Sequence, residues 1–281
     1  MKIEQWIGII AVMASVGCGS SKNSDNDTSW KSESRALSAN EKTRNECNKS
    51  GYPFGGGTGE EGNPYLICSV SQLENMANSS DPFYYLLTTD IDMTNEKHTC
   101  IGVAITGVFD GGGHGINNFN SDLSMGQENG MLFCQLFTAH SIVAEIKNLN
   151  INNLNIHSKS EYYTAGLVGS NTRDKITNVH VTGKIAGGRN VGGLVAQNFG
   201  TIRDSSFDGT ITGTSNIGGI AGRAQDFSID NCRVSGSVSG DSSIGGIVGE
   251  GDEKLTLYGN EVTAQISGNL DFGSLIGRRS H

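Results

Sequence analysis

The stretch Gly192-Gly193-Leu194-Val195-Ala196 is one of five similar units, each with small residues on both sides of a Leu or an Ile. The central apolar residues of successive units lie 27, 26, 27 and 28 residues apart. A regular period of this length is typical of a solenoid built from stacked repeats. The other four units are Ala165-Gly166-Leu167-Val168-Gly169, Gly218-Gly219-Ile220-Ala221-Gly222, Gly245-Gly246-Ile247-Val248-Gly249 and Gly273-Ser274-Leu275-Ile276-Gly277.

The segments between these units keep an equally regular pattern. In four repeats, apolar residues follow one another at spacings of five and four, and the next unit follows after nine. Short β-branched runs interrupted by Gly, Asn and Ser favour strands and turns over helices. We therefore predict an all-β, β-helix-like solenoid with coils of about 27 residues, whose inward side chains stack from coil to coil. The predicted inward residues are Ile176, Val181, Ile185, Ile202, Phe207, Ile211, Ile229, Val234, Val238, Leu257, Val262 and Ile266.

Asn178, Asp204 and Asn231 form a further column, two residues after the first inward residue of each coil. Asn and Asp tolerate left-handed turns and cap backbone groups, so we predict a ladder of stacked turns here. A calcium site is the alternative, but the neighbouring residues do not supply a dense set of acidic oxygen ligands.

The repeat resembles the GLUG motif of bacterial surface and secreted proteins. The resemblance covers residues 165–277, with a divergent earlier copy at Gly130-Met131-Leu132-Phe133-Cys134, and with the lead-in it spans about residues 53–277. It implies a β-solenoid displayed outside the cytoplasm. It says less about activity, because the motif occurs in adhesin-like proteins, in lipoproteins and beside a zinc peptidase domain. The lead-in includes Asn63-Pro64-Tyr65-Leu66-Ile67, Asp90-Ile91-Asp92-Met93 and Gly107-Val108-Phe109-Asp110-Gly111.

The N-terminus has the features of a signal peptide. Lys2 precedes a short apolar run that begins at Ile7 and is too short to be interpreted as a membrane-spanning helix. The run ends at Ser15-Val16-Gly17-Cys18, which resembles a bacterial lipobox except that Ser15 stands where Leu is usual. We predict a signal peptide over residues 1–17 and lipidation of Cys18, as by palmitate, which makes the chain a membrane-anchored lipoprotein. The alternative is an ordinary cleaved signal peptide with an incidental Cys.

Residues 18–46 are predicted to be a flexible tether, since they are polar and contain little apolar clustering. The expected location is the bacterial cell envelope, at the outer membrane or cell surface; Gly19 after Cys18 resembles an outer-membrane sorting signal. The formal net charge of -9 and the scarcity of aromatic residues argue against nucleic acid as a partner.

Five cysteines remain beside Cys18. Cys232 occupies a repeat column also held by Val179 and Ser205, so we expect it to be a small buried residue. The other four lie outside the regular coils and are candidates for two disulfides, with three pairings open. No close pair of Cys suggests zinc, and no cofactor is expected. The four are Cys47, Cys68, Cys100 and Cys134.

A solenoid must protect its ends from unwanted strand pairing. We assign residues 47–125 to an N-terminal cap with irregular first coils, and 126–281 to the GLUG-type repeats. Ser71-Gln72-Leu73-Glu74 has the form of a capping box, which predicts one short helix over residues 72–78. At the other end, Arg278 and Arg279 either blunt the last edge or accompany docking of another chain.

Catalytic motifs are scarce in this sequence. There is no His-Glu-x-x-His pattern and no phosphate-binding loop, so we do not expect an enzyme. The only catalytic candidates are Asp90 and Asp92, which would alternate on one strand face, and Asp110 in a later turn. Paired carboxylates could serve a polysaccharide hydrolase or lyase, but the same residues belong to the lead-in and its turns.

We therefore expect an exported, lipid-anchored envelope or cell-surface protein that acts as a binding or adhesion module. Its ligand would be a glycan or a host or surface protein, because long solenoid walls offer repeated surfaces to extended partners. The alternatives are a polysaccharide-active β-helix enzyme and a purely structural envelope protein.

Overall fold

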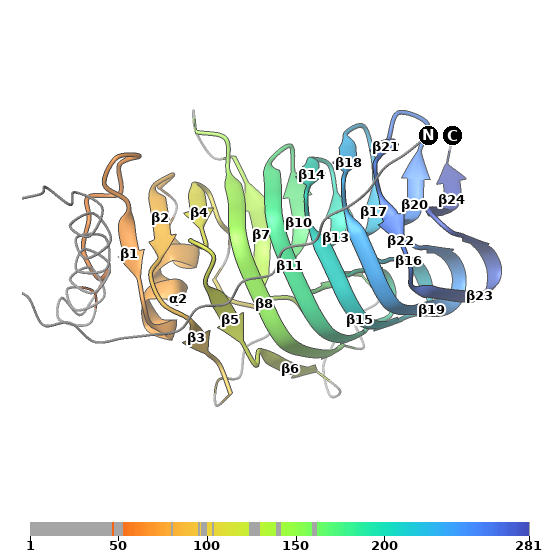
Figure 1. Ribbon diagram of the computed structural model, residues 1–281, viewed down its shortest axis with the longest axis horizontal. Helices are drawn as coiled ribbons and strands as arrows, with labels where there is room; N and C mark the ends of the chain where they lie inside the picture. Colours follow the sequence, from red (N-terminus) through yellow and green to blue (C-terminus); the bar gives the residue numbers. More distant parts are fainter. Residues whose placement is uncertain are drawn as a thin grey trace, which may run out of the picture. The chain divides into compact units, whose positions relative to one another are not determined.

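The computed structural model describes residues 47, 53–79, 81–94, 96, 100–102, 104–123, 130–138, 142–158 and 162–280. These residues all belong to one compact unit, Asn40–His281. They wind into a β-solenoid of about seven coils whose strands pair in parallel from coil to coil, which confirms the predicted fold (Figure 1).

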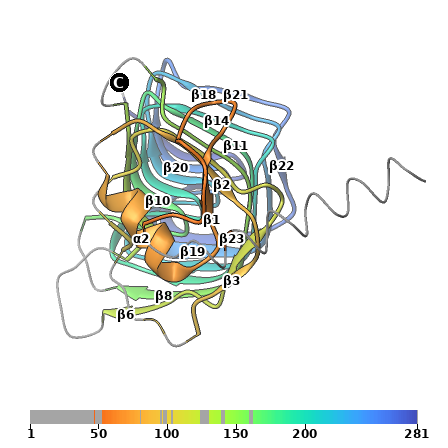
Figure 2. The same cartoon turned by 90° about the vertical axis from the view of Figure 1, so that its left-hand side faces the viewer.

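Each regular coil contributes strands to four rows, named here after one member each. The β14 row and the β15 row share the long strands β8 and β11, and the β15 row and the β16 row share β19 and β23. The fourth row is a separate six-stranded sheet, called the β13 row. Figure 2 shows these rows enclosing the core when the solenoid is viewed along its axis.

The strand bounds follow, row by row. The β14 row contains β1 (Tyr65–Ile67), β2 (Tyr84–Leu87), β4 (Val108–Asp110), β8 (Glu145–Ser158), β11 (Lys175–Ala186), β14 (Thr201–Arg203), β18 (Ser228–Asp230) and β21 (Thr256–Tyr258). The β15 row adds β3 (Ile91–Asp92), β5 (Gly115–Asn117), β6 (Asn120–Leu123), β15 (Ser206–Thr212), β19 (Arg233–Gly245), β22 (Glu261–Val262) and β23 (Gln265–Gly273). The β16 row adds β9 (Thr164–Ala165), β12 (Arg189–Gly192) and β16 (Ser215–Gly218). The β13 row contains β7 (Phe133–Phe137), β10 (Val168–Thr172), β13 (Val195–Asn198), β17 (Ala221–Ala224), β20 (Val248–Asp252) and β24 (Ile276–Ser280).

The predicted inward columns are confirmed by the strand register. Val181 pairs with Phe207 and Phe207 with Val234, and in these coils the predicted inward side chains are at most 1% exposed. The glycines of the repeated unit stand where coils approach closely: a Cβ on Gly193 would lie 2.0 Å from the carbonyl oxygen of Gly219. The repeated unit is therefore a steric requirement of stacking, since only a residue without a side chain fits there.

The predicted turn ladder is also confirmed. Asn178, Asp204 and Asn231 have φ of 54, 51 and 53°, in the left-handed region that Asn and Asp tolerate. The Asn178 side-chain amide donates to Oδ1 of Asn148 one coil earlier at 2.9 Å, and that of Asn231 donates to Oδ1 of Asp204 at 3.2 Å. Each turn is therefore tied to the turn of a neighbouring coil.

One short helix, α2 (Val70–Asn78), lies at the N-terminal end of the stack (Figures 1 and 2). It begins two residues before the predicted start, because Ser69 and not Ser71 is the N-cap and accepts a hydrogen bond from the Gln72 backbone N–H. Oε1 of Gln72 accepts from the backbone N–H of Cys68 at 2.8 Å, one residue before the N-cap, so the pair of bonds resembles a capping box without matching it. In the described part of the chain, no helix has the length and apolar character needed to cross a membrane.

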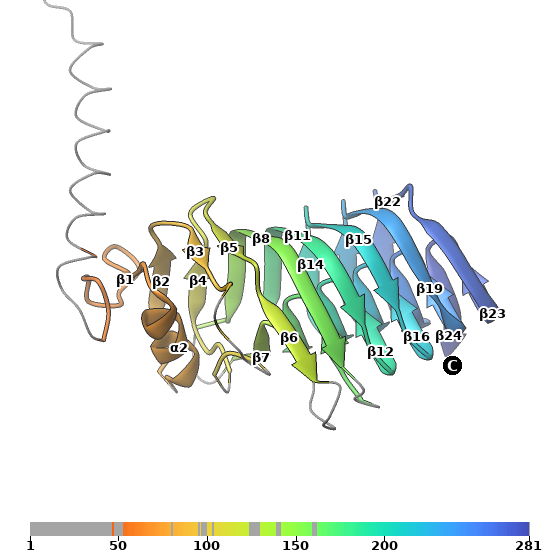
Figure 3. The ribbon, with the colours of Figure 1, turned by 90° about the horizontal axis from the view of Figure 1, so that it is seen from below.

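The coil formed by β21 to β24 is the least buried of the regular coils. Described residues pack against only one side of this coil. Its inward Val262 and Ile266 are half-buried, whereas the equivalent residues of the preceding coil, Val234 and Val238, are fully buried. Leu270 is 66% and Phe272 58% exposed. Figure 3 shows β23 and β24 at this end of the stack.

Candidate ligand-binding groove

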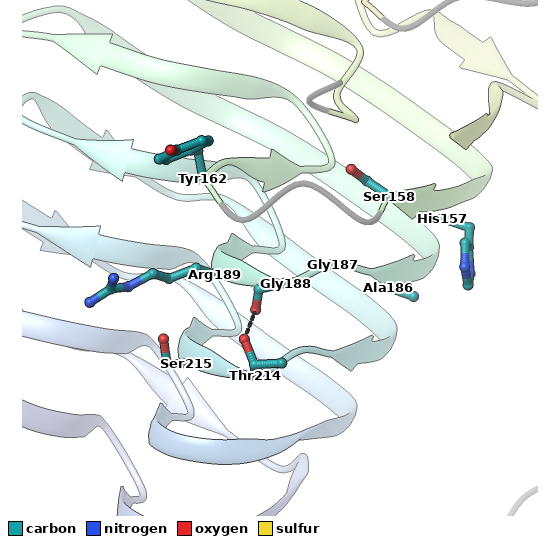
Figure 4. A pocket seen from close by; sticks show the side chains of 9 residues that line it. All are labelled: His157, Ser158, Tyr162, Ala186, Gly187, Gly188, Arg189, Thr214 and Ser215. Carbon is teal, nitrogen blue, oxygen red and sulfur yellow. Dashed lines mark hydrogen bonds between the residues drawn. The ribbon is translucent and has the colours of Figure 1, made fainter. Parts of the chain in front are cut away.

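The inward columns form the core, so a ligand must meet the outward columns or the corners between rows. A groove of about 760 Å³ lies at the corner between the β15 row and the β16 row (Figure 4). It extends over three successive coils. Its lining residues are His157, Ser158, Tyr162, Ala186, Gly187, Gly188, Arg189, Thr214 and Ser215.

Beside the groove, one connection between strands is longer in sequence than its counterparts in the following coils. Leu194 follows Ile185 by nine positions in the sequence, and Ile220 follows Ile211 by nine. In the preceding coil, Leu167 follows Ile156 by eleven positions. The longer turn carries Tyr162 at its end. The short turn of the next coil contains only glycines, Gly187 and Gly188, which leave space beside the tyrosine.

Three of the lining side chains share one column of the solenoid. Arg189 pairs in register with Ser215, and because Thr164 pairs with Val191, Tyr162 stands opposite Arg189 two residues earlier. Neighbouring strands are about 4.8 Å apart, so an aromatic ring, a guanidinium and a hydroxyl are presented in successive coils. Tyr162 is 63% exposed, and Arg189 is also exposed.

Backbone and side-chain hydrogen bonds hold this corner in place. Thr214 donates its hydroxyl to the Gly188 carbonyl at 2.8 Å, as drawn in Figure 4. The Asn190 amide donates to the Tyr162 carbonyl at 3.0 Å, and the Asn216 amide donates to Oδ1 of Asn190 at 2.9 Å. The turns that carry the lining side chains are therefore joined to one another.

The groove is basic in an acidic protein. Its lining contains Arg189 and His157 but no Asp or Glu, although the chain carries a formal net charge of -9. Among the described residues, the Arg189 guanidinium has no ion pair or hydrogen bond, and its neighbour in the next coil is Ser215. In Figure 4 the Arg189 and His157 side chains lie on opposite sides of the glycine turn.

The structure places the candidate catalytic aspartates at strand ends: Asp90 directly before β3, Asp92 as the last residue of β3, and Asp110 as the last residue of β4 and not in a turn as predicted. Asp90 lies outside β3, where its Oδ1 accepts from the Gly115 backbone N–H at 2.8 Å and lies 3.3 Å from Nδ1 of His114. Oδ1 of Asp110 accepts from the Gly112 backbone N–H at 2.9 Å and from the Asn148 amide at 3.0 Å. Each of these carboxylates thus caps local or neighbouring backbone.

Asp92 has a similar environment at the end of β3. Its Oδ1 accepts from the hydroxyl and backbone N–H of Thr94 at 2.6 and 3.0 Å and from the Asn118 amide at 2.9 Å. These bonds, that of the Thr94 hydroxyl first, lower the pKa of the Asp92 carboxyl. A carboxylate held in its charged form by turn donors is suited to capping rather than to donating a proton.

The structure joins Cys47 to Cys68 and Cys100 to Cys134, which is one of the three pairings that the sequence left open. Cys232 is free and 1% exposed, and burial raises the pKa of its thiol to about 12. No cluster of three or more His, Cys, Asp or Glu able to hold a metal ion occurs in the described ranges. Cys18, the predicted signal peptide and residues 18–46 lie outside the described residues.

Sequence reasoning missed the groove. His157 was only one of several scattered histidines, and Tyr162 and Arg189 were not candidates. The signal was nevertheless present as the two extra residues between Ile156 and Leu167, a break in an otherwise constant spacing. Insertions in solenoid repeats map to loops on one face, which is often the binding face.

Comparison with known proteins agrees with the repeat structure. The chain is 31% identical over 156 residues to Halomucin of Haloquadratum walsbyi, a match that covers 50% of this chain and 2% of that protein. A solved structure of a candidate immunoglobulin A1 protease from Bacteroides ovatus superposes with a TM-score of 0.59 at 20% identity and covers 77% of each chain. At this identity the likeness concerns the fold alone.

The GLUG motif itself matches residues 160–186, 187–212 and 213–239. Tyr162, Arg189 and Ser215 are the third residues of these three segments, so the groove lies on equivalent positions of consecutive repeats. The Gly-rich units at 245–249 and 273–277 continue the same strand register in the following coils. Residues 160–239 of this chain are thus three consecutive GLUG motifs within a β-solenoid.

Proposed function

We propose that this chain is an exported cell-surface protein that binds a glycan in the corner groove. The observation that carries the proposal is the exposed Tyr162 ring beside a groove that extends over three coils and offers both apolar and polar surface. Aromatic side chains combine a large apolar face with a polar edge, and sugars offer C–H faces and hydroxyls that match both. A groove along several coils suits an extended chain better than a compact small molecule.

The proposed location follows from two further arguments. The resemblance of residues 1–18 to a lipoprotein signal supports export and a lipid anchor at Cys18, and the polar segment that follows would hold the solenoid away from the membrane. GLUG motifs and the partial likeness to Halomucin support display at the cell surface.

The binding proposal is tested with the full chain in a glycan panel that includes neutral and charged polysaccharides. Tyr162→Ser should weaken binding about tenfold, because loss of an aromatic stacking platform costs about 1–3 kcal/mol in the comparable case of nucleic-acid bases. Tyr258→Ser is the matched control, since Tyr258 is 77% exposed and lies outside the groove. Binding of no glycan, or equal loss in both variants, would refute the proposal.

Anchoring is tested separately by incorporation of labelled palmitate in wild type and Cys18→Ala. The proposal expects loss of label and of membrane association in the variant. If the variant retains both the label and membrane association, the proposed lipid anchor at Cys18 is refuted. The proposal of ligand binding in the groove is unaffected by that result.

The alternative is an enzyme that cleaves polysaccharides, and it is tested with the same polysaccharide panel. The turn-capping hydrogen bonds of Asp90, Asp92 and Asp110 favour binding without cleavage. Release of reducing ends that disappears in Asp92→Asn but not in Tyr162→Ser would support an enzyme instead.

A further inference from the structure

The solenoid places an acidic residue beside several strand arginines but, among the described residues, not beside Arg189. Three other arginines on its strands each face an acidic residue one coil further on: Arg203 Nε lies 3.2 Å from Asp230, Arg223 3.6 Å from Glu250 and Arg233 2.9 Å from Glu261. Arg189 has Ser215 in that position, and the groove lining supplies no carboxylate. Of these four arginines, only Arg189, which lines the groove, has no acidic partner among the described residues.

A guanidinium that has no partner among the described residues is suited to a planar anion from outside. Arginine presents parallel N–H donors that match the two oxygens of a carboxylate, and such bidentate pairs are stronger than neutral hydrogen bonds. Because the chain as a whole is acidic, the Arg189 guanidinium also favours an anionic ligand in this groove.

The neighbouring groups define what else the ligand must contain. Tyr162 belongs to the coil before Arg189, two residues before the Thr164 that pairs with Val191. The Ser215 hydroxyl lies one coil after it and makes no hydrogen bond with the described residues, and Thr214 keeps acceptor capacity beside its bond to Gly188. A ligand that fits has an apolar face, hydroxyls and a carboxylate within one or two sugar units.

We infer that the groove selects acidic saccharides, with the face of one sugar on Tyr162 and a uronate-type carboxylate on the Arg189 guanidinium. This inference rests on the proposed glycan-binding function and adds the class of sugar. Arg189 sets specificity for charge, whereas Tyr162 contributes to binding of charged and neutral sugars alike.

The test compares three probes with the full chain: polygalacturonate, its methyl ester and neutral dextran. Wild type should bind polygalacturonate about tenfold more tightly than the methyl ester, which is the low end for charge-assisted hydrogen bonds because the site is exposed. Arg189→Gln should remove that preference by lowering the affinity for polygalacturonate to the level of the ester. Arg189→Lys should restore part of it, since a point charge remains but the paired donors are lost.

Arg173→Gln is the matched control. It removes the same charge from an exposed arginine that does not line the groove. The inference is overturned if Arg173→Gln loses as much affinity for polygalacturonate as Arg189→Gln, or if wild type does not prefer polygalacturonate to its ester. If the neutral probe or the ester still binds and Tyr162→Ser weakens that binding about tenfold, only the acidic selectivity fails. If no probe binds, the proposed function fails with it.

Discussion

Replacement of Gly209 by alanine should disrupt the stack at its centre. Gly209 lies in β15, paired in register with Gly183 of β11 and Gly236 of β19. Its φ is +151°, and an added Cβ would lie 1.9 Å from the Gly183 carbonyl oxygen. The substitution thus combines an unfavourable backbone conformation with a clash against backbone, which cannot rotate away.

The two effects can be estimated separately. A non-glycine residue at this φ costs about 1–3 kcal/mol. Real Cβ atoms essentially never approach closer than 3.0 Å, so the strands must separate by about 1.1 Å at this point. That movement weakens the flanking ladder hydrogen bonds, each worth about 1 kcal/mol net. The expected loss in the free energy of unfolding is about 3–5 kcal/mol, a large share of the stability of a typical domain.

Urea denaturation of the full chain, followed by circular dichroism with disulfides intact, measures this loss. Gly113→Ala provides the strain without the clash, since its φ is +81° and nothing lies within 4 Å, and should cost about 1–2 kcal/mol. Gly62→Ala has neither and should stay within about 0.5 kcal/mol of wild type. If Gly209→Ala unfolds at the same urea concentration as Gly62→Ala, the steric account of the glycine columns is wrong.

Three further predictions concern buried groups. Because the pKa of the Cys232 thiol is about 12 in the folded chain against 9.0 for an ordinary thiol, stability should fall as pH rises from 9 toward 12, and Cys232→Ala should flatten that part of a urea-midpoint profile. Removal of the disulfide between Cys47 and Cys68 by a double Ala variant should destabilise the cap by about 3 kcal/mol, measured by hydrogen exchange of α2 amides. Asn198→Ala should cost about 1–3 kcal/mol in urea midpoints, since it leaves the buried Asn171 amide without its 2.8 Å partner; a loss below 0.5 kcal/mol would contradict this.

The fold was predictable because its determinants repeat. Phe207, Ile211 and their equivalents recur at constant spacing, and parallel stacking converts that spacing directly into buried columns. The turn ladder through Asn178 and Asn231 was predictable for the same reason: the residue type that tolerates a left-handed turn stands at the same place in successive coils.

The start of the helix was less predictable. Ser69-x-x-Gln72 and Ser71-x-x-Glu74 both have the form of a capping box. The choice between them depends on the chain before the helix, where Gln72 can reach the Cys68 backbone and Cys68 is joined to Cys47. These are tertiary constraints, and local propensity does not contain them.

The coil period, the buried columns and the glycine positions follow from the sequence, because each depends only on spacing and on steric limits that every coil shares. The tertiary structure alone decided which cysteines pair and where a ligand could bind. A disulfide requires two cysteines whose Cα atoms come within about 7 Å, and the groove requires residues of three coils side by side. Tyr162 and Arg189 are 27 residues apart in the chain and become neighbours only when the coils stack.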